Sequence, residues 1–415
     1  METLIRRYLN YLGNVSLEYV RDLESEIDWN DRLISIRGQR GVGKTTMLLQ
    51  HILKTFGDCD TTSVIYVSLD NIYFANHGLL DFIETFHQRG GKFLFLDEVH
   101  KYKGWSVEVK NAYDEFSDLH IVFTGSSLIN ILDSEVDLSR RCISYDMQGL
   151  SFREYLALFK GVDIPSMSLE EILSEPEKMC RKVCSEVKPL QFFNEYLQYG
   201  YYPFLLEGVK SYAMRIENIV NMIIETELPI MRSLDSGNIR KIKALLSILA
   251  SGLPMSIDTV KLSKMAEVSR TTLLAYLQHL DAAKIIRLLY SDNHSVKRMQ
   301  KPDKVYLENT NMQYALGGME VNMGNIRETF FANQLSHAHT VEYSSTAADF
   351  LIDGKYTFEV GGSAKDGRQT AEVSNAWIAA DEVWGIMRFK ICYAPIARTK
   401  FFIYLCTVIL DGKNT

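Results

Sequence analysis

Glycine, lysine and threonine occur early in the chain at the spacing of a phosphate-binding loop. The stretch from Gly38 to Thr45 fits G-x-x-x-x-G-K-[ST] at every fixed position. Glycines let the backbone turn its N–H groups around a phosphate, the lysine reaches the β- and γ-phosphates, and the hydroxyl is a ligand for Mg²⁺. The pattern therefore predicts ATP and Mg²⁺ as ligands and the nucleotide-binding residues Gly38, Gln39, Arg40, Gly41, Val42, Gly43, Lys44, Thr45 and Thr46.

The segments around this loop favour it over the alternative of a glycine-rich turn that happens to end in Lys-Thr. The apolar run 32–37 before it predicts a buried strand, and residues 44–56 after it have the apolar spacing of a helix. A helix that begins at the loop points the positive end of its dipole at the phosphates. Lys44 is accordingly predicted to stabilise the transferred phosphate as well as to bind it.

Two adjacent carboxylates end a second apolar run, from Lys92 to Glu98. Ligands collect at the carboxyl ends of buried parallel strands, so this run is typical of a Walker B strand. Asp97 is predicted to hold the Mg²⁺ shell together with Thr45, and Glu98 to polarise the attacking water. An acidic, solvated turn is the alternative, which the phosphate loop about 50 residues upstream makes less attractive.

Residues 31–147 alternate apolar strands with helical segments, which predicts an α/β fold with a parallel sheet covered by helices. Strands are expected at 32–37, 63–70, 93–97 and 120–125, and helices at 44–56, 78–89 and 105–117. The last strand ends in Thr124-Gly125-Ser126-Ser127, so Thr124 or Ser126 could sense the attacking water. A simple Ser- and Gly-rich turn is an equal alternative.

Arg140 and Arg141 follow this region and are candidates for an arginine finger. A planar cation beside the γ-phosphate stabilises the charge that spreads over its oxygens in the transition state. Either arginine could instead be a surface cation, and a finger could act within its own chain or on a neighbouring subunit of a homo-oligomer.

Composition predicts a multidomain protein of the cytoplasm. The 415 residues are 47% hydrophobic and 23% charged, with 8 prolines and a net charge of −7. No apolar run approaches the roughly 18 residues of a membrane span, and the amino terminus lacks the apolar core of a signal peptide. The six cysteines are scattered apart from Cys180 and Cys184, so they are interpreted as reduced thiols.

Several motifs together give the chain a family resemblance. Besides the two nucleotide motifs, they are the strand end at 124–127, Leu150-Ser151-Phe152-Arg153-Glu154-Tyr155 and Gly200-Tyr201-Tyr202-Pro203. The chain resembles prokaryotic AAA-type P-loop ATPases that carry a C-terminal domain of unknown function similar to restriction endonucleases. The resemblance implies ATP binding and hydrolysis. The expected domains are an ATPase core with an N-terminal helical strap (1–147), a helical lid (148–237), a winged helix-turn-helix (238–305) and a nuclease-like α/β domain (306–415).

Residues 238–304 are basic, with 12 lysines and arginines against 5 acids. Helices expected at 239–250, 259–266 and 269–280, followed by a strand and a basic hairpin, predict the winged helix-turn-helix and DNA as a possible partner. The exposed face of the third helix would carry Arg270, Thr271, Thr272 and Tyr276, and the wing would place Lys297, Arg298, Lys301 and Lys304 near phosphates. A role in interdomain packing is the alternative.

The last region contains three carboxylates in the order that a metal-dependent nuclease needs: Glu328, Asp349 and Glu359. We expect them to converge on a possible second metal site. The lysine that usually follows two residues after the last carboxylate is Gly361 here, and the nearest lysine is Lys365. Two functions therefore remain: an ATP-driven switch acting on nucleic acid or a protein partner, and an ATP-gated nuclease.

Overall fold

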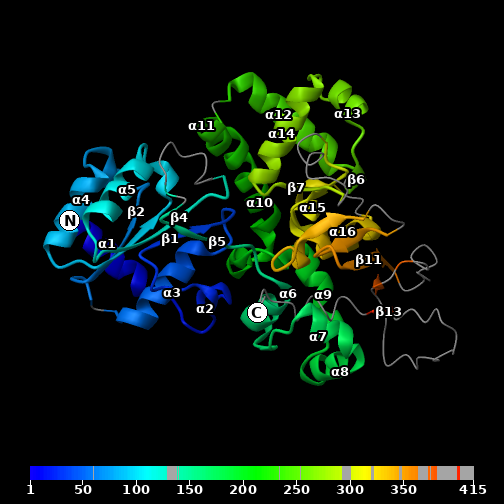
Figure 1. The fold of residues 1–415 in the computed structure, drawn as a ribbon, viewed down its shortest axis with the longest axis horizontal. Coiled ribbons are helices and arrows are strands. Elements are labelled where there is room, and N and C mark those ends of the chain that lie inside the picture. The colour runs from blue at the N-terminus through cyan, green and yellow to red at the C-terminus, as the bar shows by residue number, and fades with distance from the viewer. Residues whose placement is uncertain are drawn as a thin grey trace. The chain divides into compact units, whose positions relative to one another are not determined.

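The structure is a computed structural model that divides into two compact units, Met1–Gly149 and Leu150–Thr415 (Figure 1). It describes the chain except for residues 59, 129–137, 139, 233, 253, 292–300, 319–321, 345–347, 363–372, 374, 381–399 and 402–415. Among the residues it describes, no helix combines the length and apolar character needed to cross a membrane.

The first unit is built on a parallel sheet with the strand order β2-β3-β4-β1-β5. Its strands are β1 (Leu33–Arg37), β2 (Val64–Ser68), β3 (Phe93–Asp97), β4 (His120–Gly125) and β5 (Ile143–Asp146). The first four were predicted, because strands buried on both faces are continuous apolar runs. The edge strand β5 is mostly exposed and was not predicted.

Helices connect these strands and cover the sheet (Figure 1). They are α1 (Glu2–Leu12), α2 (Leu23–Glu26), α3 (Lys44–Phe56), α4 (Leu79–Gln88) and α5 (Trp105–Glu115), with short 3₁₀ turns η1 (Ile72–Ala75) and η2 (Val99–Lys101). Helices α1 and α3 pack together and against β2, and α4 packs against α5. The topology places β4 between β1 and β3, so the end of β4 lies between the phosphate loop and the Asp97-Glu98 pair.

The second unit begins with helices and short turns. They are α6 (Phe152–Lys160), α7 (Leu169–Ser174), α8 (Pro176–Glu186), α9 (Leu190–Glu195), η3 (Tyr196–Gly200), η4 (Pro203–Glu207), η5 (Val209–Ser211), α10 (Tyr212–Met222), η6 (Ile223–Glu227) and α11 (Leu228–Arg232). The Ser151 motif is a capping box at α6: the Ser151 hydroxyl accepts the Glu154 N–H, and the Glu154 carboxylate accepts the Ser151 N–H.

Two sheets follow. The first is antiparallel, in the order β6-β8-β7, and accompanies α12 (Ser236–Ala250), α13 (Thr259–Met265) and α14 (Arg270–Ala282); its strands are β6 (Met255–Ser256), β7 (Ile286–Leu289) and β8 (Lys304–Leu307). After α15 (Thr310–Leu316) and α16 (Met323–Leu335) comes a mixed sheet in the order β13-β12-β11-β10-β9. Its strands are β9 (Val341–Tyr343), β10 (Phe350–Ile352), β11 (Tyr356–Gly361), β12 (Ala376–Ala380) and β13 (Lys400–Phe401).

Two of the three regions that the sequence separates after residue 147 are joined by buried hydrogen bonds. Asn311 is 1% exposed, and its amide nitrogen donates to the carbonyl oxygens of Tyr196 at 3.0 Å and Leu197 at 2.8 Å. Its amide oxygen accepts the Tyr201 N–H at 2.8 Å. Buried polar groups must find partners within the protein. The expected lid and the expected C-terminal domain therefore complete each other's hydrogen bonds.

Candidate nucleotide site and the other predicted sites

The phosphate loop has backbone geometry that only glycine adopts without strain. Gly41 and Gly43 have φ values of 85° and 103°, in the left-handed region. Gly38 is required for lack of space: a Cβ at this position would lie 2.2 Å from the Met147 carbonyl oxygen. The three glycines of the motif are thus each required, two by conformation and one by close packing.

Lys44 lies in the loop that it is predicted to serve. Its side chain is 5% exposed, and Nζ donates to the carbonyl oxygens of Gly38 at 2.8 Å and Gln39 at 3.1 Å. Both acceptors of the Lys44 ammonium are neutral carbonyl oxygens. Phosphate oxygens would form stronger, charge-assisted hydrogen bonds with it and can therefore replace them.

The two nucleotide motifs meet at Asp97. Its Oδ2 accepts the hydroxyl of Thr45, from the start of α3, at 2.6 Å. Its Oδ1 accepts the hydroxyl of Thr124, at the end of β4. Thr45 and Asp97, the two predicted metal ligands, are therefore in contact, and a hydroxyl beside a carboxylate is a fitting donor set for Mg²⁺.

Tyr66 is a third residue on Asp97, and the sequence did not single it out. Its hydroxyl, from the neighbouring strand β2, donates to Asp97 Oδ2 at 2.7 Å. Burial, followed by the negative charge of Asp97, raises the pKa of Tyr66 far above its ordinary value, so the phenol stays a donor. A tyrosine inside an apolar strand gives no sequence signal beyond packing.

Replacing Tyr66 by phenylalanine should lower ATP turnover about 10-fold, because a hydrogen bond to a charged group contributes about 1.5–3 kcal/mol. The measurement is the steady-state rate of phosphate release. The matched control is Tyr102→Phe, since the Tyr102 hydroxyl also donates to a carboxylate, Glu108 Oε1 at 3.1 Å. Equal rates of phosphate release in the two variants would show that the Tyr66 hydroxyl does not contribute to hydrolysis.

Glu98 follows Asp97 in an unusual conformation. Its φ of 53° lies in the left-handed region, which costs a non-glycine residue about 1–3 kcal/mol. The Glu98 N–H donates to Asp97 Oδ1 at 3.1 Å and to Thr124 Oγ1 at 3.2 Å, which holds the turn. Thr124 therefore joins the two carboxylate residues, a positioning role beside the predicted sensing of water.

The two candidate arginines have different surroundings. Arg141 forms a two-point ion pair with Asp114 of α5, Nε to Oδ1 at 2.8 Å and Nη2 to Oδ2 at 3.2 Å. This arginine holds the pKa of Asp114 below its ordinary value. Arg140 is exposed. Which arginine serves as a finger stays a prediction.

Ser126, the other candidate sensor, is 7% exposed, and its hydroxyl accepts the Leu128 N–H at 3.4 Å.

The predicted second metal site is not assembled. The described residues, which include Glu328, Asp349 and Glu359, hold no group of three or more His, Cys, Asp or Glu side chains that could bind a metal. Glu328 instead accepts hydrogen bonds from Lys304 Nζ at 2.5 Å and the Tyr306 hydroxyl at 3.0 Å. Asp349 accepts the Val360 N–H at 2.8 Å and so fixes the β10–β11 hairpin. Glu359 is 2% exposed on β11.

The basic segment differs from its prediction in two residues. Tyr276 is 3% exposed rather than on the free face of α14, and its hydroxyl bonds to Asn238 of α12. Lys304 is on β8 and paired with Glu328, so it is not a free wing residue. Arg270, Thr271 and Lys301 are exposed as expected. Lys297, Arg298 and Lys365 lie outside the described residues, as does most of the tail after 380.

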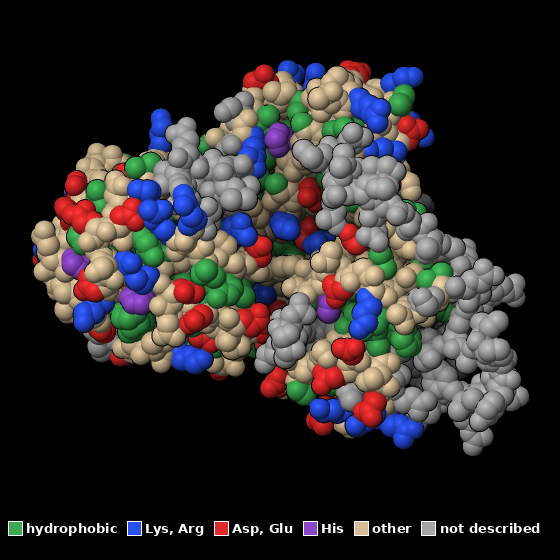
Figure 2. All heavy atoms as spheres, viewed as in Figure 1, with side chains coloured by type: hydrophobic (Ala, Val, Ile, Leu, Met, Phe, Trp, Pro, Cys, Tyr) green, Lys and Arg blue, Asp and Glu red, His purple; other side chains and the backbone are tan. Residues whose placement is uncertain are grey.

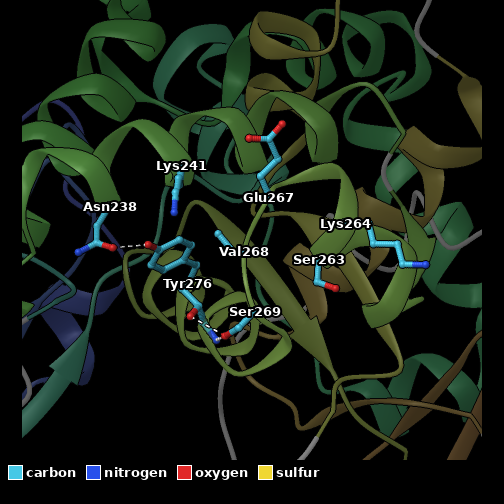
Figure 3. A pocket seen from close by; sticks show the side chains of 9 residues that line it. Asn238, Lys241, Ser263, Lys264, Glu267, Val268, Ser269 and Tyr276 are labelled. Carbon is cyan, nitrogen blue, oxygen red and sulfur yellow. Dashed lines mark hydrogen bonds between the residues drawn. The ribbon is translucent and has the colours of Figure 1, made fainter.

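A polar cleft of about 420 Å³ opens among these helices (Figure 3). Its lining comes from α12, α13, the turn between α13 and α14, and the first two turns of α14: Asn238, Lys241, Ser263, Lys264, Glu267, Val268, Ser269, Thr272 and Tyr276. Figure 3 shows the Lys241 amino group pointing toward Tyr276, whereas the Glu267 carboxylate points away from both. Figure 2 shows lysine and arginine side chains over this part of the chain, with acidic side chains among them.

Comparison with known proteins supports the nucleotide site. Residues 30–156 match a family model described as an AAA domain, and residues 190–322 match a domain of unknown function (DUF8612). The uncharacterized protein MJ1637 of Methanocaldococcus jannaschii is 26% identical over 397 residues, which cover 88% of this chain and 83% of that protein.

Two solved structures overlap with 67% of this chain at low similarity. AMPPCP-bound DnaA from Aquifex aeolicus has a TM-score of 0.25 and 15% identity over 86% of that chain, and PCH-2 from C. elegans has 0.23 and 14% over 69%. Such TM-scores add nothing to the domain match and the site geometry. The family-model match and the site geometry together show that residues 30–156 form an AAA-type P-loop ATPase domain.

Proposed function

We propose that the protein binds Mg·ATP and hydrolyses it to drive a conformational switch. The observation that carries this is the meeting of both nucleotide motifs at Asp97, whose carboxylate accepts the hydroxyls of Thr45, Tyr66 and Thr124. A chance glycine-rich turn would have no reason to contact the end of β3. Lys44 and the loop N–H groups bind the phosphates, and Glu98 polarises the attacking water.

Thr45 and Asp97 would hold Mg²⁺ between them, directly or through water. When bound, the cation neutralises charge on the β- and γ-phosphate oxygens. The chain's own residues supply the rest. Tyr66 and Thr124 orient the Asp97 carboxylate, and the same Thr124 hydroxyl holds the Glu98 backbone. A base held in this way can accept a proton from water without first reorganising.

Phosphate release from ATP by the full chain tests the proposal directly. Turnover should require a divalent cation and should disappear on chelation with EDTA. Tight ATP binding without any release of phosphate would leave a nucleotide-binding protein in place of an ATPase. Failure to bind ATP at all would refute the proposal.

A second activity, binding of the duplex DNA backbone, is favoured by the way α12–α14 use their charges. Two acids cap helices: Asp235 accepts the Asn238 N–H at 2.8 Å, and Asp258 accepts the N–H groups of Val260 and Lys261 at 3.0 Å each. Five basic side chains are exposed: Arg240, Lys241, Lys261, Lys264 and Arg270. The order α12-β6-α13-α14-β7-β8 is that of the winged helix-turn-helix proposed here.

Removing three of these cations should make DNA binding less sensitive to salt. Each phosphate contact contributes about −0.9 to the slope of log K against log salt, so the triple substitution of Lys241, Lys264 and Arg270 by alanine should flatten the slope by roughly 2 to 3 units. Fluorescence anisotropy across a salt series measures it. The control is the triple alanine variant at Lys182, Lys188 and Lys210, exposed lysines elsewhere in the same unit. Equal slopes in the two variants would place the contact elsewhere.

The nuclease alternative is not carried forward, because Glu328 is engaged by Lys304 and Tyr306 and Gly361 cannot supply a positive group near an attacking water. We propose that the C-terminal region, residues 306–415, acts as a binding or assembly module. Cleavage of a supercoiled plasmid with Mg²⁺ or Mn²⁺, lost in Glu359→Ala, would overturn that choice.

A further inference from the structure

Arg21 reaches the phosphate loop from the segment between α1 and α2, where the sequence indicated no chemistry. The side chain is 8% exposed. Its Nη1 donates to the Val42 carbonyl oxygen at 2.7 Å. Its Nη2 donates to the carbonyl oxygens of Gln148 at 2.9 Å and Gly149 at 3.1 Å. One guanidinium thus joins the phosphate loop to the last residues of the first unit.

The hydrogen bond to Val42 determines which way a loop N–H points. In a planar trans peptide, the carbonyl of Val42 and the N–H of Gly43 point in opposite directions. Arg21 binds the Val42 carbonyl, so the Gly43 N–H points away from Arg21. A buried carbonyl also needs a donor, and Arg21 provides one.

The other end of the guanidinium holds the connection to the second unit. Met147 is already fixed against the loop, because its N–H donates to the Arg37 carbonyl oxygen at 2.7 Å and its own carbonyl packs against Gly38. Leu150 is fixed within the second unit by its N–H bond to the Tyr201 carbonyl oxygen at 2.7 Å. Gln148 and Gly149 are the residues left between them, and Arg21 binds both carbonyls.

We propose that Arg21 is a positioning residue that directs the Gly43 N–H toward the nucleotide and couples the occupied loop to the Gln148–Gly149 junction. The proposal rests on the ATPase function proposed above. A shift of the Val42–Gly43 peptide on phosphate binding is passed by the rigid guanidinium to the junction. Because coupling is reciprocal, the state of the junction must also change nucleotide affinity.

The first test compares Arg21→Lys with Arg32→Lys in the full chain. Lysine keeps the charge but donates from one nitrogen, so it cannot replace a planar fork that holds separate carbonyls. Arg32 is the matched control: Nη2 of this arginine, at the start of β1, donates to the carbonyl oxygens of Tyr113 at 2.8 Å and Phe116 at 2.9 Å. Arg21→Lys should raise the KM for ATP roughly 10-fold or more with little change in kcat, whereas Arg32→Lys should leave KM unchanged.

The second test measures the coupling by hydrogen–deuterium exchange at saturating ATP analogue. In the wild type, nucleotide should slow exchange both in the loop and at residues 147–151. In Arg21→Lys the loop should stay protected while the junction loses its protection, a result that general destabilisation would not produce. Absence of junction protection in the wild type would overturn the proposal without any variant.

Failure of this inference is distinguishable from failure of the ATPase proposal. If the wild type neither binds nor hydrolyses ATP, the ATPase proposal fails. If the wild type turns over ATP but the two lysine variants have the same KM, or junction protection survives in Arg21→Lys, the ATPase stands and the role of Arg21 is refuted.

Discussion

Replacing Glu98 by glutamine should remove ATP hydrolysis and leave nucleotide binding intact. A positioned general base contributes on the order of 10²–10⁴-fold, and the amide cannot take a proton from water. The change keeps the size of the side chain, and the N–H bonds of Glu98 to Asp97 and Thr124 do not involve its carboxylate. Single-turnover hydrolysis and equilibrium binding of a fluorescent ATP analogue separate the two properties.

Glu115→Gln is the control for Glu98→Gln, because Glu115 is an exposed carboxylate at the end of α5 in the same unit. It should hydrolyse ATP at the wild-type rate. Wild-type turnover by Glu98→Gln would show that the base is another residue, and loss of binding would show that Glu98 shapes the loop rather than the reaction.

Lys44→Ala should abolish nucleotide binding. The lysine is predicted to form two or more charge-assisted hydrogen bonds to phosphates, each contributing about 1.5–3 kcal/mol, so affinity should fall roughly 10²- to 10⁴-fold. Isothermal titration calorimetry with ATP and Mg²⁺ measures this. Thermal melting should show a folded protein, since the two carbonyl oxygens to which the lysine donates belong to its own loop.

Lys54→Ala tests whether any lysine of α3 gives the same effect. Lys54 is on the same helix and pairs with Glu24 at 2.9 Å, but its side chain is 58% exposed. Lys54 lies in the last turn of α3, whereas the phosphate loop is at its start, so affinity for ATP should not change. Similar losses in both variants would point to damage to α3 as a whole.

Sequence patterns predicted the ATPase core well because its chemistry and its packing are both local. The phosphate loop is a continuous motif, and each buried strand is a continuous apolar run.

The prediction that Tyr276 is exposed on α14 misread a pattern that was present in the sequence. Leu273, Tyr276, Leu277 and Leu280 have the i, i+3, i+4, i+7 spacing of one buried helix face. The signal for its burial was therefore present.

Other contacts had no sequence signal at all. Arg21 donates to backbone carbonyls, and every residue has a carbonyl, so no residue type marks its partners. Lys304 and Glu328 are 24 positions apart on different elements, and only the folded chain brings them together. Likewise, the sequence carries no signal for whether α16, which carries Glu328, and β11, which carries Glu359, bring their carboxylates together.

The buried hydrogen bonds that join distant segments of the second unit set the order in which the protein can fold during synthesis. The Phe152 N–H donates to the Gln334 side chain, 182 residues later, and the partner of the Tyr196 carbonyl is 115 residues later. At about 5–20 residues per second, α6 waits roughly 9 to 36 s for its partner to leave the ribosome. The ATPase core, complete by Gly149, has every strand of its sheet long before then. The nascent chain therefore carries a finished nucleotide domain followed by an unfinished aromatic core, which is when chaperone binding should be strongest.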